Sequence, residues 1–302
     1  MFLGVFAASL VAVSAAIAAP ASPAPRQDET RVYISVTGRD GEAVTVLKQD
    51  IEVAEDGQAR EVLRLERAEV PPQIALLVDD SQAAQSAIAE TRTGLRQFVT
   101  RVLEANPETQ IALISFGERP TLLVDYTSNA QALERGIGRI FARPGSGAYM
   151  LEALVSASHG VKKRGVERAH MIVIGTEGIE FSNDHFDRVL DALADSGATL
   201  WALTLTSGPR ASDTDETRNR AIVLGRGTEN SGGRQYQVLA NSAIPRRLDA
   251  IAGLILGQYV VTYARPDTLV PPKKLEITVS TPGAEVLVPA VAPPVRKTGL
   301  WQ

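Results

Sequence analysis

The sequence predicts an α/β fold: a doubly wound, mostly parallel sheet with helices on both faces, plus a small accessory β region from the N- and C-terminal segments. Two observations lead to this prediction. In the middle of the chain, continuous apolar runs of strand length, such as residues 74–78, alternate with segments that carry apolar residues at helical spacing. On either side of this part, short β-branched runs are separated by turn residues, which is typical of antiparallel strands.

The central alternation defines the expected elements. Buried strands are expected at 74–78, 111–116, 171–174 and 199–205, edge strands at 122–124 and 234–238, and helices at 86–105, 129–141, 150–163, 185–195 and 245–256. Such alternation implies βαβ units and a mainly parallel sheet. The polar stretch 207–219 is expected to be a loop or the start of a helix, and Gly225-Arg226-Gly227 is expected to lie in a loop.

The flanks predict the accessory β region. Strands are expected at 32–37, 51–57 and 61–65, and then at 258–263, 274–280 and 285–288. Asp56-Gly57 is a strong hairpin signal. We expect the segments from the two ends of the chain to form one auxiliary sheet.

Composition narrows the classes of function. The chain has 302 residues, a net charge of −4 and no cysteine. The absence of cysteine excludes thiolate sites and disulfides, and the charge gives no footprint for a nucleic-acid partner. The sequence contains no phosphate loop, no nucleophile elbow and no pair of histidines at metal-ligand spacing. These observations favour a protein that is not an enzyme.

The N-terminus reads as a targeting segment. Residues 1–19 are almost wholly apolar and contain Ala16-Ile17-Ala18, which fits a cleavage site of a signal peptide. The alternative is an uncleaved N-terminal membrane anchor. Either interpretation predicts an exported protein, periplasmic or extracellular. The expected division is a signal at 1–19, a linker at 20–30, β segments at 31–69 and 258–290 around a central domain at 70–257, and a tail at 291–302.

Three loops are expected at the carboxyl ends of buried strands or at a helix entrance, where open α/β sheets bind ligands. They are Asp79-Asp80-Ser81, Gly145-Ser146-Gly147-Ala148 and Gly175-Thr176-Glu177-Gly178. Their order resembles the three metal loops of von Willebrand factor A (VWA) domains, over about residues 71–256. Segments 36–41, 53–57, 231–236 and 258–263 resemble the flanks of bacterial VWFA-related proteins.

The resemblance implies a divalent cation that captures an acidic group of a protein partner. The matching ligands are Asp79, Ser81 and Glu177, with Glu177 where the family has Asp, while Ala83 and Ala148 replace two hydroxyl ligands. Mg²⁺ and Ca²⁺ need several oxygen ligands. We therefore expect a degenerate site that binds Mg²⁺ or Ca²⁺ weakly or not at all. Alternatively, Asp79 caps the next helix and accepts backbone N–H bonds.

The resulting expectation is a non-enzymatic, exported protein-binding module of VWA type. Its partner is a protein of the envelope or the extracellular space. The expected partner-binding face comprises Asp79, Asp80, Ser146, Ala148 and Glu177. Two alternatives stay open: an enzyme on a Rossmann-like sheet with an unrecognised site, and a purely structural envelope scaffold.

Overall fold

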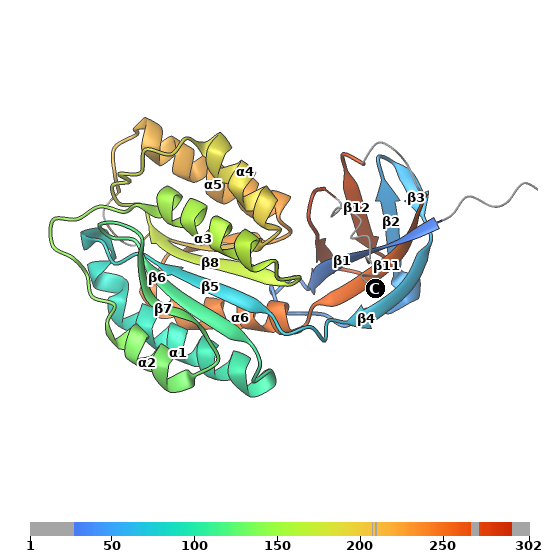
Figure 1. The fold of residues 1–302 in the computed structure, drawn as a ribbon, viewed down its shortest axis with the longest axis horizontal. Coiled ribbons are helices and arrows are strands. Elements are labelled where there is room, and N and C mark those ends of the chain that lie inside the picture. Colours follow the sequence, from blue (N-terminus) through green and yellow to red (C-terminus); the bar gives the residue numbers. More distant parts are fainter. Residues whose placement is uncertain (1–26, 207, 209, 267–271, 292–302) are drawn as a thin grey trace, which may run out of the picture.

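A computed structural model of the chain describes residues 27–206, 208, 210–266 and 272–291, and its central layer is a six-stranded sheet (Figure 1). The strand order is β10-β9-β8-β5-β6-β7, and every neighbouring pair is parallel except β6 and β7. The predicted doubly wound, mostly parallel sheet is confirmed. The strands are β5 (Gln73–Val78), β6 (Gln110–Ser115), β7 (Thr121–Thr127), β8 (Ala169–Thr176), β9 (Thr199–Leu205) and β10 (Arg234–Val238).

Helices cover both faces of this sheet (Figure 1). One face packs against α1 (Ile88–Ala105), α2 (Ala130–Gly138) and α6 (Ile244–Leu256). The other face packs against α3 (Met150–Arg164), α4 (Phe186–Ser196) and α5 (Asp215–Asn230). Within the described residues, no helix combines the length and the apolar character needed to cross a membrane.

The central strand β5 is buried on both faces, which explains the continuous apolar run at residues 74–78. Ile74, Leu76 and Val78 enter the core under α1, α2 and α6, whereas Ala75 and Leu77 enter the core under α3 to α5. Side chains alternate between the faces of a strand, so a strand covered on both faces must be apolar at every position.

The terminal segments form two antiparallel sheets, not the single auxiliary sheet expected. The first has the order β13-β1-β11-β4 and the second β12-β2-β3. Ile34, Val53, Tyr263 and Ile277 lie in the core that these strands share, so each sheet buries its apolar side chains. The strands are β1 (Gln27–Thr37), β2 (Ile51–Glu55), β3 (Gln58–Arg60), β4 (Val62–Arg67), β11 (Tyr259–Pro266), β12 (Leu275–Val279) and β13 (Glu285–Leu287).

Near its two ends, the chain can be compared with the expected signal, linker and tail only in part. Strand β1 begins at Gln27 and pairs with Pro266, so the last residues of the stretch expected as a linker belong to a strand. The expected signal segment at 1–19 lies outside the described residues, as does the tail beyond residue 291.

Helix α5 corrects another expectation. It runs through Gly225-Arg226-Gly227, which was expected to be a loop. A Cβ on Gly227 would lie 3.2 Å from side-chain atoms of both Leu193 and Leu200, so the glycine lets α5 approach α4 and β9 closely. This packing outweighs the low helix propensity of glycine.

A buried arginine joins the accessory β region to the central sheet. The Arg168 guanidinium donates to Gln258 Oε1 (2.9 Å), to the Val70 carbonyl (2.8 Å) and to the Ile255 carbonyl. Burial lowers the pKa of Arg168 to about 10. These contacts lie where β5 and β8 begin, so the accessory sheets sit at the opposite end of the sheet from the three loops (Figure 1).

Candidate functional site: the loop face

The structure brings the three loops together at the carboxyl edge of the central sheet. The first loop follows β5 and the third follows β8, which are neighbours in the sheet, and the second loop leads into α3. The Gln82 amide donates to the Ser146 carbonyl at 3.4 Å, and Ala148 forms a parallel β-bridge with Glu180. We call the surface formed by residues 79–83, 143–149 and 176–182 the loop face.

Asp79 ties the first loop to the third. Its Oδ1 accepts the Ser81 amide (2.8 Å), and its Oδ2 accepts the Thr176 amide (3.1 Å) and the Thr176 hydroxyl (2.6 Å). Asp79 therefore accepts backbone N–H bonds, as expected in the alternative to a metal ligand. It does not cap α1, because that helix begins only at Ile88, after a 3₁₀ segment.

Asp80 ties the first loop to the second. Its Oδ1 accepts the Gly117 amide (2.6 Å) and its Oδ2 accepts Arg143 Nε (2.9 Å). The hydrogen bond to Asp80 raises the pKa of the Arg143 guanidinium. A Cβ on Gly117 would lie 2.5 Å from the backbone of Asp80, so this approach requires glycine. A fixed cation thus neutralises Asp80 from within the chain.

The third loop is paired in a similar way. Glu177 Oε2 lies 2.5 Å from Arg210 Nε, and the Glu177 carbonyl accepts the Ala211 amide at 2.8 Å. A Cβ on Gly178 would lie only 2.4 Å from the Cβ of Ala83. Ala83, which stands where the family has a hydroxyl ligand, therefore packs directly against Gly178.

Two apolar side chains project from the loop face. The Ile179 carbonyl accepts the Ala148 amide (2.8 Å), and the Phe181 amide donates to the Ala148 carbonyl (2.7 Å). Because side chains alternate along such an extended segment, Ile179 and Phe181 point outward while Glu180 points inward. Ile179 is 55% exposed and Phe181 is 46% exposed, with the Phe181 ring lying over Gly147.

Glu180 lies beneath these two side chains. Its Oε1 accepts the amides of Met150 (3.0 Å), at the start of α3, and Ser182 (3.3 Å). Its Oε2 lies 3.9 Å from Arg220 Nη1. Burial raises the pKa of Glu180 to about 7, although the two amides and Arg220 act in the opposite direction.

The donor set does not fit a hard divalent cation. Ser81 offers a buried hydroxyl without a hydrogen-bond partner, which would suit a ligand. Both oxygens of Asp79 already accept protein donors, Glu177 is held by an arginine, and Ala83 and Ala148 offer only methyl groups. In the part of the chain that the structure describes, no three acidic or histidine side chains are grouped as ligands. Mg²⁺ and Ca²⁺ need about six or more oxygen ligands.

The expected partner-binding face is only partly at the surface. Asp79, Asp80 and Ala148 are buried, with 3%, 2% and 2% exposure, so they cannot contact a partner directly in this conformation. Their polar groups are used to hold the loops together. Ser146 and Glu177 remain partly exposed.

Four further residues of this region were missed in the sequence. Ile179 and Phe181 form its outer surface, and the alternation Ile179-Glu180-Phe181 is the signal that would have indicated this. Arg143 and Arg220 supply its internal cations. Neither arginine stands in a motif, and only the fold brings them to the loops.

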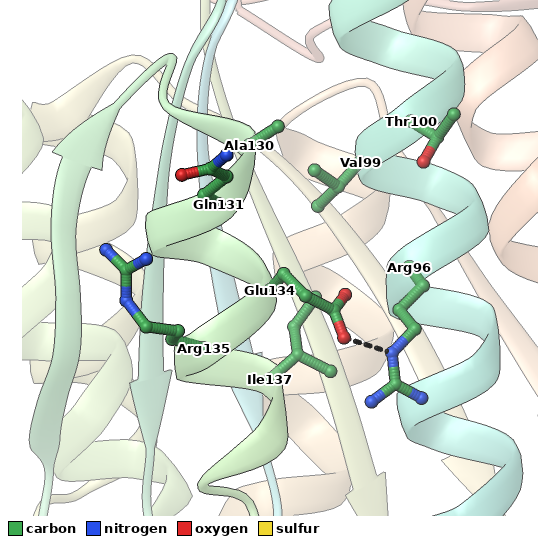
Figure 2. A pocket seen from close by; sticks show the side chains of 8 residues that line it. All are labelled: Arg96, Val99, Thr100, Ala130, Gln131, Glu134, Arg135 and Ile137. Atoms are coloured by element: carbon green, nitrogen blue, oxygen red, sulfur yellow. Dashed lines mark hydrogen bonds and ion pairs between the residues drawn. The ribbon is translucent and has the colours of Figure 1, made fainter.

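A cavity of about 460 Å³ lies elsewhere, between α1 and α2. In Figure 2 the Arg96 and Glu134 side chains meet across it, and they form an ion pair at 2.7 Å. Its lining contains no residue of the loop face: Arg96, Val99, Thr100, Ala130, Gln131, Glu134, Arg135 and Ile137. This cavity is separate from the site that the three loops define.

A doubly wound sheet with three such loops at its carboxyl edge is the arrangement of a VWA-type fold. Residues 74–178 match the family model of the von Willebrand factor type A domain. The chain thus carries a von Willebrand factor type A domain, extended by accessory β-sheets. A search of curated proteins finds no significant match.

Solved structures agree with this fold at low sequence identity. The pilus adhesin SpaC from Lactobacillus rhamnosus GG aligns with 81% of this chain and 48% of its own, at 13% identity and a TM-score of 0.51. This chain thus spans about half of that adhesin, and the likeness shows the fold alone. A von Willebrand factor type A protein from Catenulispora acidiphila has 10% identity, coverages of 86% and 72% and a TM-score of 0.49. The vWF domain of the pili tip protein Mfa5 from Porphyromonas gingivalis is 13% identical and has a TM-score of 0.46. The alignment covers 61% of this chain and 95% of that domain.

Proposed function

We propose that this chain is a non-enzymatic, exported binding module whose loop face contacts another protein without a divalent cation. The observation that carries the proposal is the pair Ile179 and Phe181, which is about half exposed on a segment held by two backbone hydrogen bonds to Ala148. A rigid apolar pair costs little conformational entropy when a partner covers it.

The surroundings of this pair suit a protein interface. Arg210 and Arg143 have side chains that are 70% and 38% exposed, and both lie beside loop carboxylates. Aromatic residues and arginine are enriched at protein interfaces, where they supply most of the large binding energies. The solved structure of SpaC, which shares this fold, is that of a pilus adhesin, and this agrees with a binding role.

Export rests on the apolar N-terminal segment at residues 1–19, and the partner is therefore a protein of the envelope or the extracellular space. The absence of a recognisable nucleophile, base or phosphate loop favours binding over catalysis. The carboxylates of the loop face also have partners within the chain, so they are poorly placed for acid–base chemistry.

The test uses a photo-crosslinking residue placed at position 181 in the producing cell. A matched control carries the crosslinker at position 47, because Leu47 is an exposed apolar residue (59%) of the accessory β region. We expect a specific protein adduct from position 181 and none from position 47. An adduct pattern that is the same for both positions would contradict the proposal.

The captured partner is then purified and its Kd is measured against variants. We expect Ile179→Ser with Phe181→Ser to weaken binding at least tenfold, because full burial of each side chain is worth about 1.5–3 kcal/mol and about 1.4 kcal/mol is tenfold. Leu47→Ser and EDTA should leave the Kd unchanged. Loss of binding in EDTA would show that the contact depends on a metal.

A further inference from the structure

A buried guanidinium lies directly beneath the third loop. Arg220 stands in the second turn of α5 and is 8% exposed. Its Nη1 donates to the Gly178 carbonyl at 2.7 Å and lies 3.9 Å from Glu180 Oε2. Burial lowers the pKa of the Arg220 guanidinium, and the carboxylates of Glu180, Asp79 and Glu177 act in the opposite direction. These three acidic groups come from the first and third loops.

We propose that Arg220 is a built-in cation of the loop face, which partly compensates the buried carboxylate of Glu180 and fixes the third loop where metal-binding relatives would use a divalent ion. It is a positioning residue, because it acts on the loops and not on a ligand. The inference goes beyond the proposed binding function and concerns the chain on its own.

The charge balance of the buried groups supports this assignment. Glu180 Oε2 accepts no hydrogen bond within the described residues, although the atom is buried. A buried carboxylate needs a compensating charge or it takes up a proton. Arg220 at 3.9 Å supplies part of that charge, since burial still raises the pKa of Glu180 to about 7, and a guanidinium keeps its proton at every physiological pH.

The packing of α5 fixes the position of this cation. The helix starts with a capping box, in which Thr214 accepts the Thr217 amide. Val223 and Leu224 then enter the core beneath the central sheet. Because the helix is anchored on both sides of Arg220, the guanidinium cannot leave, whereas a bound ion can be removed by a chelator. The loop face should therefore keep its shape in EDTA.

A double-mutant cycle on the full chain, without any partner, tests the proposal by thermal unfolding. The variants are Arg220→Met, Glu180→Gln and the two together. Arg220→Met should lower Tm strongly, because it leaves Glu180 uncompensated, and Glu180→Gln in the same chain should recover part of the loss. The matched control is Arg96→Met, because Arg96 is an exposed arginine of α1 whose partner Glu134 is also exposed. Its Tm should change little.

Two further measurements distinguish charge from packing. Arg220→Lys keeps the charge and should fall between the wild type and Arg220→Met, and it remains measurable if the Met variant does not fold. The wild-type Tm should be the same in EDTA and in millimolar Mg²⁺, Ca²⁺ or Mn²⁺. The proposal is overturned if Arg220→Met costs no more than Arg96→Met, if Glu180→Gln gives no relief, or if a divalent ion raises the wild-type Tm. The wild-type and mutant Tm values are measured without a partner, so failure of this proposal would leave the proposed binding function untouched, and the reverse also applies.

Discussion

The Thr176 hydroxyl donates a 2.6 Å hydrogen bond to the carboxylate of Asp79, and both residues are buried. The bond joins the end of β8 to the residue that follows β5, so it links the third loop to the first. Thr176 thereby occupies a lone pair of the carboxylate that the family resemblance assigns to a metal. The same contact makes Thr176 a structural residue of the loop face.

Thr176→Val should therefore destabilise the chain by about 1–3 kcal/mol, because it leaves a buried carboxylate oxygen short of a donor while keeping the side-chain shape. Urea unfolding measures the change. The control is Thr93→Val, since Thr93 is exposed on α1 and bonds only within its own helix. Equal effects of the two substitutions would show that the bond to Asp79 contributes nothing.

Gly178→Ala should also be costly. The added methyl would lie 2.4 Å from the Cβ of Ala83, so the first and third loops must separate. Such overpacking costs about 1–3 kcal/mol. In Gly160→Ala the new methyl meets nothing within 4 Å on α3, and we expect a gain of about 0.5–1 kcal/mol from helix propensity. Opposite signs in urea unfolding are the expected outcome, and a neutral Gly178→Ala would refute the close contact.

His170 should make stability depend on pH. It is fully buried, accepts the Trp201 Nε1 hydrogen at 3.3 Å, and burial lowers its pKa to about 3. Between about pH 6.5 and 3 the unfolded chain binds a proton there that the folded chain does not. Stability from this residue is thus complete above pH 6.5 and falls by about 1.4 kcal/mol per pH unit below it.

The measurement is urea unfolding of the wild type and His170→Gln at pH 7, 6 and 5. Other groups titrate in both proteins, so the difference between the two isolates His170. The wild type should lose its advantage over the variant as the pH falls. Parallel pH profiles would mean that His170 has the same pKa in the folded and the unfolded chain.

Arg168→Met should weaken the junction between the central sheet and the accessory β region. The substitution removes the donors to three backbone carbonyls and to Gln258, and each buried acceptor left unsatisfied costs about 1–3 kcal/mol. Arg31→Met is the control, because Arg31 is half exposed and pairs with Glu167 at 3.5 Å. We expect faster limited proteolysis near residues 68–70 only in Arg168→Met. Unchanged cleavage there would contradict the role of Arg168.

Much of the fold could be predicted because its signals are local. Strand β5 is buried on both faces, so its sequence has to be apolar at every position. The Asp56-Gly57 pair predicts a turn because both residues tolerate positive φ, and they adopt φ 48° and φ 76°. Helix α5 could not be predicted in this way. Its polar sequence and two glycines argue for a loop, and only contacts with Leu193 and Leu200 show why Gly227 is needed.

The site was harder to predict than the fold for the same reason. The order of the three loops indicated where they meet, since parallel strands end at one edge. The fate of their carboxylates depends on arginines from other elements: Arg143 lies 63 residues from Asp80, and Arg220 lies 42 residues from Gly178. Residues 207–219 were expected to be a loop or the start of a helix, and residues 225–227 a loop, so the position of Arg220 had no basis in the sequence alone.

We propose that the loop face is held by its own arginines and takes no divalent ion. The most direct test is calorimetric titration of Mg²⁺, and then Ca²⁺ or Mn²⁺, into the full chain after treatment with EDTA, with Asp79→Ala as the control. We expect only heats of dilution, the same for both proteins. A saturable heat in the wild type that disappears in Asp79→Ala would show a working metal site and refute a metal-free loop face.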